Sequence, residues 1–349
     1  MKDRQLRDGK IVRSEEPLNL ESPFENLDGF ITPTARFYVR THFPVPKIDK
    51  DEWRLSILGE VEKPFDISFD ELSKLETRTL PVTLECAGNN REFLEPKVKG
   101  VQWALGAVGN ANWTGVSLSI LLERAGLKSS AREIIFEGAD AGELEEAKAP
   151  RGKVTFARSI PLEKAQDVLL AYRMNDVDLP PLHGFPLRAI VPGWYAMASI
   201  KWLTRIVVTD RSFNGYYQTL DYAFWKNGEL APLREMQTKA QIARPANGET
   251  VPANSNVRVH GAAWTSGEIS KVEVSVDGGS TWKEAKLLGE SKPNAWRLWE
   301  YNWQTPKAGS ATLIARAFDS RGETQPVERD WDRGTYMINQ LLPINVAIE

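Results

Sequence analysis

The C-terminal part of the chain consists of short runs in which apolar and polar residues alternate. After residue 232 these runs recur roughly every 10 residues, with Gly, Asp or Pro between them. In KVEVSV, Val272, Val274 and Val276 share one face of an extended segment, and the polar residues between them share the other. Such strands are typical of an antiparallel sandwich of the immunoglobulin type. We therefore predict an all-β domain over residues 232–349.

The preceding residues, 1–231, mix predicted strands and helices without a regular alternation. Ser68 and Glu71 form an S-x-x-E capping box at the start of a short helix, and Gly126 ends a helix with an apolar stripe. Strands are predicted over 52–61, 80–88, 132–140 and 168–174, with two more within 186–209. This mixture indicates an α+β domain and not a doubly wound sheet. No GxGxxG or P-loop motif follows a strand, which disfavours nicotinamide and ATP as cofactors.

Two segments are predicted to have no sheet of their own. Residues 1 to about 30 are polar and irregular, and we expect a surface arm that wraps the first domain. The stretch MQTKAQIARPANGETVP, residues 236–252, is predicted to be the linker into the sandwich.

The charge balance and hydropathy of the chain limit its partners. Lys and Arg number 44 against 47 Asp and Glu, so no bulk positive field favours nucleic acid or anionic lipid. No apolar run approaches the length of a membrane span, and the charged opening MKDRQLRDGK lacks the apolar core of a signal peptide. We expect a soluble, cytoplasmic protein, or a periplasmic one if the chain is a trimmed mature form.

The chain has a single cysteine, Cys86, within ECAGNNRE at the end of a predicted strand. One cysteine excludes an intrachain disulfide, a CxxCH haem attachment and a cysteine-rich iron–sulfur site. A thiolate beside Arg91 could bind a metal or act as a nucleophile, whereas a free cysteine is often only a buried apolar residue. Gly88 and the two Asn residues that follow allow a close approach of the backbone, which a plain core position does not need.

Basic and imidazole side chains gather in three Pro- and Gly-containing loops. These are Arg40 with His42 in FYVRTHFPVP, Arg91, and His183 with Arg188 in HGFPLRAIVPG. Several guanidinium groups together indicate a phosphate-bearing cofactor and an anionic substrate. The histidines, with His260, lack the short spacing of a zinc module, but a Cys–His nucleophile pair stays open at this point.

ECAGNNRE resembles the molybdopterin-binding domain of the sulfite oxidase family. The segments VKGVQWALGAVGNANWTGVSL, FYVRTHFPVP, LPPLHGFPLRAIVPG and IKWLTRI resemble the same family in the same order. GAAWTSGEISKVEVSVDGGSTWKEA and AWRLWEYNW resemble its C-terminal dimerisation domain. The resemblance covers about residues 35 to 335 and has no haem domain before it.

The resemblance implies a molybdenum cofactor with molybdopterin, no haem, and Cys86 as the thiolate ligand of the metal. It places the following residues around the pterin and its phosphate: Tyr38, Val39, Arg40, Thr41, His42, Asp140, His183, Arg188, Ser199, Ile200 and Lys201. Around the substrate and the metal it places Arg40, Cys86, Arg91, Trp103, Phe213 and Arg333.

The activity that the resemblance implies is oxidation of sulfite to sulfate by oxygen-atom transfer. Since the chain has no haem segment, the electrons would pass to an external acceptor, for which a c-type cytochrome is the natural choice. The sandwich implies a homodimer. Residues 1–231 would then be the catalytic domain and residues 232–349 the dimerisation domain.

Three positions depart from the family pattern. Asn90 stands where animal and plant members have an arginine, and Phe213 in RSFNGY stands near the active-site tyrosine, which Tyr216 or Tyr217 could replace. The WDRG segment that carries Arg333 is one residue shorter than usual. These changes leave open a molybdenum-dependent reductase of a sulfoxide or nitrate-like oxide. A non-enzymatic assembly protein, with Cys86 merely buried, is the alternative of another class.

Overall fold

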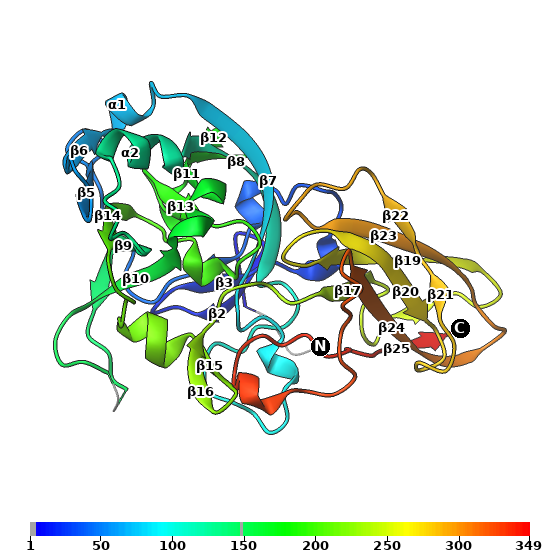
Figure 1. Ribbon diagram of the computed structural model, residues 1–349. Helices are drawn as coiled ribbons and strands as arrows, with labels where there is room; N and C mark the ends of the chain where they lie inside the picture. The colour runs from blue at the N-terminus through cyan, green and yellow to red at the C-terminus, as the bar shows by residue number, and fades with distance from the viewer. Residues whose placement is uncertain (1–4, 147–148) are drawn as a thin grey trace.

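The computed structural model of the protein describes residues 5–146 and 149–349. Figure 1 shows two parts side by side, a mixed domain with the two α-helices and a sandwich of strands. Sheet dominates both parts, and the helices are short. Among the described residues, no helix is long and apolar enough to cross a membrane. The mixed domain followed by an all-β domain has the α+β character that the sequence predicts.

Two five-stranded sheets form the frame of the first domain. One has the order β10 (Val154–Pro161), β9 (Glu133–Gly142), β14 (Leu203–Thr209), β5 (Arg54–Gly59) and β6 (Phe65–Ser68). The other has the order β12 (Val177–Asp178), β11 (Leu169–Met174), β8 (Val108–Ser117) and β7 (Thr77–Glu85), with β13 (Arg188–Ile190) also paired to β11. Strand β14 runs parallel to β5, and the other pairs in these sheets are antiparallel. The strands predicted from the sequence are all present.

The helices begin and end where the local sequence predicts. The Ser68 side chain accepts from the backbone of Glu71 and the Glu71 side chain accepts from that of Ser68, which completes the capping box of α1 (Phe69–Leu72). Helix α2 (Leu118–Ala125) buries its apolar stripe and ends at Gly126, whose φ of 69° suits glycine. Single turns of 3-10 helix are η1 (Phe24–Asn26), η2 (Thr34–Arg36), η3 (Arg91–Phe93), η5 (Pro181–His183), η6 (Ala196–Ala198) and η8 (Trp331–Arg333), with a longer one, η4 (Leu162–Asp167), and a π-helical turn, η7 (Tyr217–Asp221).

The N-terminal segment is not the irregular arm that we expected. Its strands β1 (Leu6–Arg7), β2 (Lys10–Ser14) and β3 (Asn19–Glu21) form a sheet with β4 (Val39–Arg40). Leu20 and Phe24 are buried, and Glu21 accepts hydrogen bonds from the backbone of Ala104 and Gly106. The polar composition of the segment therefore reflects both exposed residues, at 5–9 and 15–17, and buried hydrogen-bonding ones such as Asn19 and Glu21.

The sandwich consists of two sheets. One has the order β17 (Lys239–Arg244), β19 (Asn256–Trp264), β23 (Arg297–Gln304) and β22 (Lys286–Leu288). The other has the order β18 (Thr250–Val251), β25 (Ile344–Ile348), β24 (Gly309–Asp319), β20 (Ile269–Ser275) and β21 (Lys283–Glu284). Val272 and Val274 are buried in the sandwich core, as the alternation predicts. The predicted linker is wrong over residues 239–244, because these form β17, which pairs with β19.

Between the two parts lies the hairpin of β15 (Ala223–Lys226) and β16 (Glu229–Pro232), so the predicted division between residues 231 and 232 falls inside a strand and stays a prediction. The apolar core of the first domain extends across this division, because Trp264, Trp296 and Met337 belong to it. In Figure 1 the orange and red segment before β25 returns from the sandwich to lie beside this hairpin. The second domain therefore packs closely on the first.

Candidate active site

Cys86 follows the last residue of β7 and begins a tight turn. Its backbone donates to Ala107 O at 2.9 Å, and Asn89 N donates back to Cys86 O at 2.9 Å. Asn90 then takes a left-handed conformation with φ of 74°, and both its backbone and its side chain donate to Ala104 O. The turn thus presents the Cys86 side chain at the rim of a cavity, although the residue is only 7% exposed.

A cavity lies beside Cys86 and opens to solvent. Tyr38, Arg40 and His42 line it, whereas Val39 and Thr41 do not, because side chains alternate along the extended backbone of β4. The other lining residues are Phe37, Leu84, Ala87, Asp140, Phe156, Leu182, His183, Arg188, Ala196, Met197, Ser199, Lys201, Trp202 and Tyr222. The structure therefore brings together most residues of the three basic loops.

Positive charge predominates inside this cavity. Arg188 donates to His183 O at 3.1 Å and to Ser199 O at 3.0 Å, and Lys201 donates to Leu182 O at 3.1 Å. Arg40 donates to the neighbouring Thr41 carbonyl. None of these contacts is to a carboxylate, and within residues 5–146 and 149–349 Asp140 is the one acidic residue that lines the cavity. Buried cations in such a setting favour an anionic guest.

The pKa shifts of these groups have the same origin. Burial lowers the pKa of Lys201 well below its ordinary value, with a further contribution from Arg188, while Asp140 opposes the shift. Burial lowers the pKa of Arg188 to about 10 and raises the pKa of Asp140 to about 6. Burial also raises the pKa of the Cys86 thiol, whereas Arg40 and Arg91 act to lower it. An anion at this place would favour the charged forms of Lys201 and Arg188, and a metal ion would favour the Cys86 thiolate.

Arg91 lies in the wider mouth that connects the cavity to solvent, where Cys86, Arg40 and His42 also appear. Its guanidinium donates to Val101 O at 2.8 Å and to Thr335 O at 3.1 Å. Gly88 and Gly100 lie against it, because a Cβ on Gly88 would stand 2.3 Å from Arg91 Nη2 and one on Gly100 2.7 Å from Nη1. The two glycines thus form a cradle that only a residue without a side chain allows.

Comparison with known proteins identifies the family. The model of the oxidoreductase molybdopterin binding domain matches residues 42–217, and that of the Mo-co oxidoreductase dimerisation domain matches residues 231–348. Sulfite oxidase of Gallus gallus is 35% identical to the chain over 341 residues, which cover 91% of the chain and 73% of that protein. The chain belongs to the sulfite oxidase family.

The relatives of the chain include both sulfite oxidases and nitrate reductases. Mitochondrial sulfite oxidase of Mus musculus is 37% identical over 341 residues, which are 90% of the chain but 61% of that protein. The chain therefore spans about 61% of the length of this relative. NADH nitrate reductase of Petunia hybrida is 32% identical over 365 residues, covering 93% of the chain and 40% of that protein.

A solved structure supports the same assignment. The sulfane dehydrogenase SoxCD of Paracoccus pantotrophus superposes with a TM-score of 0.82 at 28% identity, covering 95% of the chain and 84% of that chain. The predicted order, a molybdopterin-binding domain followed by an immunoglobulin-like dimerisation domain, is confirmed.

The cavity fits the molybdopterin cofactor of the sulfite oxidase family. Among the described residues, Arg188 Nε and Asp140 Oδ1 have no hydrogen-bond partner, and Arg188, Lys201 and Arg40 form no close ion pair with a carboxylate, although the charge of Asp140 acts on Lys201. Arg188, Lys201 and His183 could hold a phosphate, Asp140 could accept from pterin N–H groups, and Cys86 could bind the metal. Among the residues described, no three His, Cys, Asp or Glu side chains group as a metal site, which disfavours the zinc interpretation.

Several residues that the family resemblance singled out do not line the cavity. The side chains of Val39, Thr41 and Ile200 are buried elsewhere, and Thr41 instead donates to Leu18 O at 2.8 Å. Ser199 lines the cavity but its hydroxyl accepts from Val191 N at 3.0 Å. Trp103 is fully buried behind Tyr38, with ring centroids 6.4 Å apart. It therefore supports the cavity wall without facing the cavity.

Phe213 and Arg333 do not line the cavity or its mouth in the structure, and their placement at the active site stays a prediction. Phe213 lies in a surface hollow with Glu60, Ile135 and Val207, and its backbone donates to Glu133 at 3.1 Å. The Arg333 side chain donates to Asp330 at 3.0 Å and to Asn339 at 2.8 Å, while its neighbours Asp332 and Gly334 line the mouth.

Asn90, which stands where animal and plant members of the family have an arginine, has a structural role. It is fully buried, its amide donates to Ala104 O at 3.0 Å, and it does not line the cavity or its mouth. The side chain therefore secures the turn after Cys86.

The sequence analysis missed Tyr222, which lines both the cavity and its mouth together with Cys86. Its hydroxyl is 2.7 Å from His42 Nε2. Tyr336, also missed, lies at the mouth with its ring 5.2 Å from the Arg91 guanidinium. The motif LDYAFW, which carries the phenol of Tyr222, has no local feature that marks it as a site. The only sequence feature that could have pointed to Tyr222 is the cluster of tyrosines at positions 216, 217 and 222.

Proposed function

We propose that the chain oxidises sulfite to sulfate at a molybdenum cofactor bound through Cys86. The observation that carries this proposal is the position of the lone thiol at a cavity in which three buried cations, Arg40, Arg188 and Lys201, outnumber one acidic residue, Asp140, among the described residues. The 35% identity to Gallus gallus sulfite oxidase supports the choice of substrate. When bound, the cofactor would supply oxygen-atom transfer and accept two electrons.

Within this proposal, the chain's own residues bind and orient the oxyanion. Arg40 and Arg91 lie at the mouth beside Cys86 and would attract a sulfite anion by charge and by N–H donors. Tyr222 would add a hydroxyl at the same place, held by His42. Because the walls around Cys86 are buried, these charges act in a medium of low dielectric constant and are stronger than in water.

The test uses protein produced in a host that makes the cofactor. We expect sulfite-dependent reduction of ferricyanide by the purified, molybdenum-containing protein. Cys86→Ser is the matched control, because it replaces one sulfur by oxygen and should abolish turnover. If the loaded protein reduces no ferricyanide with sulfite, the proposal is wrong.

A second candidate is a reductase of nitrate or a sulfoxide, which the 32% identity to Petunia hybrida nitrate reductase favours. Neither Phe213 nor Asn90 supports it, because neither faces the cavity. Chemically reduced protein mixed with nitrate or dimethyl sulfoxide decides between the candidates. Reoxidation by nitrate, together with no reaction with sulfite, would favour the reductase.

We further propose that the electron acceptor is a basic protein such as a c-type cytochrome. At the mouth, Trp225 and Leu230 face each other across the β15–β16 hairpin, and they are 53% and 48% exposed. An exposed apolar pair of this kind is typical of a docking site. The acidic residues of the mouth are Glu16, Glu143, Glu145, Glu146, Asp221 and Asp332. These carboxylates would repel sulfite, so attraction of a basic protein is the better reason for them.

The match to a dimerisation domain over residues 231–348 supports a homodimer as the assembled form. The mass of the protein in solution at micromolar concentration checks this, and the mass of a monomer would contradict it.

Metal analysis of the same preparation distinguishes an enzyme from an assembly protein that has no catalytic activity. Protein that lacks molybdenum, although its host makes the cofactor, would support the assembly protein. We place the protein in the cytoplasm as an expectation, or in the periplasm if the chain is a mature form.

A further inference from the structure

Glu85 precedes Cys86 and points in the opposite direction, into the contact between the two domains. Its side chain is 1% exposed, and Oε1 accepts from Lys239 Nζ at 2.8 Å. Lys239 belongs to β17 of the sandwich and is itself 2% exposed. The residue that begins the sandwich is thus ion-paired to the residue beside the candidate metal ligand.

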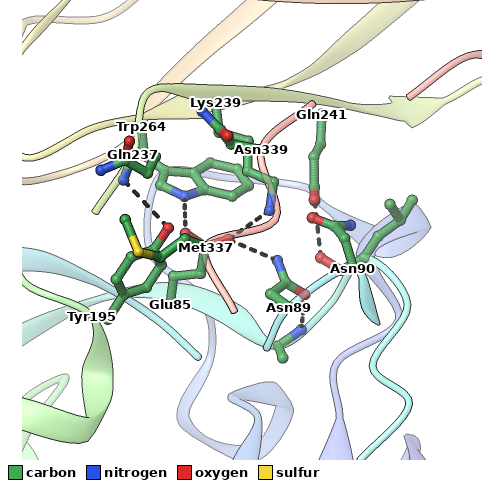
Figure 2. Close-up of polar contacts among 12 residues, drawn as sticks. Glu85, Asn89, Asn90, Tyr195, Gln237, Lys239, Gln241, Trp264, Met337 and Asn339 are labelled. Atoms are coloured by element: carbon green, nitrogen blue, oxygen red, sulfur yellow. Dashed lines mark hydrogen bonds and ion pairs between the residues drawn. The ribbon is translucent and has the colours of Figure 1, made fainter. Parts of the chain in front are cut away.

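Two further donors complete the surroundings of this carboxylate. Trp264 Nε1, from β19 of the sandwich, donates to Glu85 Oε2 at 2.9 Å. Asn89 Nδ2, from the turn after Cys86, donates to Glu85 Oε1 at 3.1 Å, and Asn89 Oδ1 accepts from Ala107 N at 3.1 Å. Figure 2 shows Trp264 and Asn89 both directed at Glu85, beneath the strand that carries Lys239. The carboxylate therefore joins two sandwich strands to both ends of the Cys86 turn.

A second contact from the same domain reaches the turn. Met337 N, in the segment before β25, donates to Ala87 O at 2.9 Å. Ala87 follows Cys86 directly, so residues on either side of the thiol are held by the second domain. A turn that carries a metal ligand needs such support, because partners behind a ligand fix its orientation.

Stability alone does not explain why this pair is ionic. A buried ion pair loses about as much free energy from desolvation as it gains from attraction, and apolar residues of the same size often serve as well. The Lys239 ammonium also lies 5.7 Å from the centre of the Trp264 ring, which is fully buried. The pair does, however, place opposite charges in a medium of low dielectric constant directly behind the Cys86 backbone.

We propose that Lys239 and Glu85 are positioning residues of the molybdenum centre, which hold the Cys86 turn and set the electrostatic potential at its sulfur. The second domain is then part of the metal centre as well as a dimerisation module. This inference rests on the proposed function, because it requires Cys86 to bind molybdenum. It differs from that function in what it predicts, since it concerns the properties of the metal and not the choice of substrate.

The test is a redox titration of molybdenum-loaded protein at about pH 8, in which the EPR signal of Mo(V) is measured at each potential. Lys239→Met leaves a carboxylate without its cation, so we expect a lower midpoint potential. Glu85→Gln leaves a cation without its carboxylate, so we expect a higher one. The double variant should return toward the wild-type value, and Lys239→Arg should keep both the potential and the signal. Shifts of opposite sign distinguish an electrostatic role from a merely structural one.

Two controls keep the test decisive. Lys271→Met breaks an ion pair of the same 2.8 Å length with Glu273 on the outer side of the sandwich, and it should leave the potential unchanged. Trp264→Phe, which keeps an aromatic ring and removes one donor to Glu85, should lower the potential even if Lys239→Met fails to fold. Variants that retain molybdenum with wild-type potential and signal would overturn the inference alone. Wild-type protein without molybdenum would overturn the proposed function as well.

Discussion

The hydroxyl of Tyr222 lies 2.7 Å from Nε2 of His42, at the rim of the cavity that contains Cys86. Burial, together with Arg40 and Lys201, lowers the pKa of His42 well below its ordinary value, so its ring is neutral at neutral pH. Burial raises the pKa of Tyr222, so its hydroxyl keeps its proton. The pair therefore presents a neutral phenol hydroxyl, held in a fixed orientation, at the mouth of the cavity.

Removing this hydroxyl should slow turnover without unfolding the protein. Tyr222→Phe is expected to lower kcat/KM for sulfite by about tenfold, the effect of losing one hydrogen bond of ~1.4 kcal/mol in the transition state. Steady-state assays with ferricyanide as oxidant measure it.

Phe213 provides the control for this prediction. Since its ring lies in a separate surface hollow, Phe213→Tyr should leave kcat/KM within experimental error and should not rescue Tyr222→Phe. Rescue of Tyr222→Phe by Phe213→Tyr would instead place residue 213 at the site.

Arg158 should be essential for the stability of the segment that carries Tyr222. It is fully buried and donates to the carbonyl groups of Tyr217, Tyr222 and Leu233, without a carboxylate among these partners. Arg158→Met removes this donor from all three carbonyls, of which Tyr222 O keeps the backbone N–H of Leu233, and should lower the free energy of unfolding by about 3 kcal/mol. Urea denaturation checks the value. Arg205→Met, which removes a half-exposed ion pair with Glu137, should change it by less than about 1 kcal/mol.

The position of Cys86 could be predicted because its cause is local. A β-branched apolar run followed by Gly and Asn predicts a strand that ends in a turn, and the capping box of Ser68 and Glu71 is equally local. The core face of β20 followed from alternation alone. In each case, neighbours within a few residues determine the outcome.

The position of Tyr222 could not be predicted, because it depends on distant segments. The π-helical turn over Tyr217–Asp221 changes the direction of the chain after Phe213, and its carbonyls are bound by Arg158 from another strand. The pairing of residues 6–21 with β4 is likewise non-local, and its polar composition hid a buried segment. Residue spacing along the sequence carries no record of such contacts.

Lys201 should stabilise the protein with bound cofactor and should lower the free energy of unfolding of the cofactor-free protein. Because burial lowers the pKa of Lys201, the unfolded chain binds more protons than the folded one at pH values below the ordinary 10.5. Stability of cofactor-free protein should therefore rise as the pH rises from neutral toward 10. Lys201→Met should remove this rise, and at pH 7 it should stabilise cofactor-free protein by about 0.5–2 kcal/mol.

Thermal denaturation of the cofactor-free forms measures both effects, and molybdenum content measures the loss of binding. Lys286→Met, at an exposed position of the sandwich, is the control and should change neither. If Lys201→Met destabilises the cofactor-free protein at pH 7, the attraction between the ammonium and Asp140 outweighs the cost of burying the ammonium, and the prediction is wrong.

The acidic mouth should give two oxidants opposite dependences on salt. Ferricyanide is an anion, so screening of the mouth carboxylates by salt should raise its rate of reduction or leave it unchanged. Horse cytochrome c is basic, and its rate should fall by about tenfold between roughly 20 and 200 mM salt. Replacing Glu143, Glu145 and Glu146 together by Gln should flatten the salt dependence of cytochrome reduction, whereas Glu284→Gln on the outer sandwich should not.

Replacing Trp225 and Leu230 by Ala should slow cytochrome reduction and leave ferricyanide reduction intact. Equal effects of these variants on both oxidants would mean that the protein acceptor does not dock at this mouth.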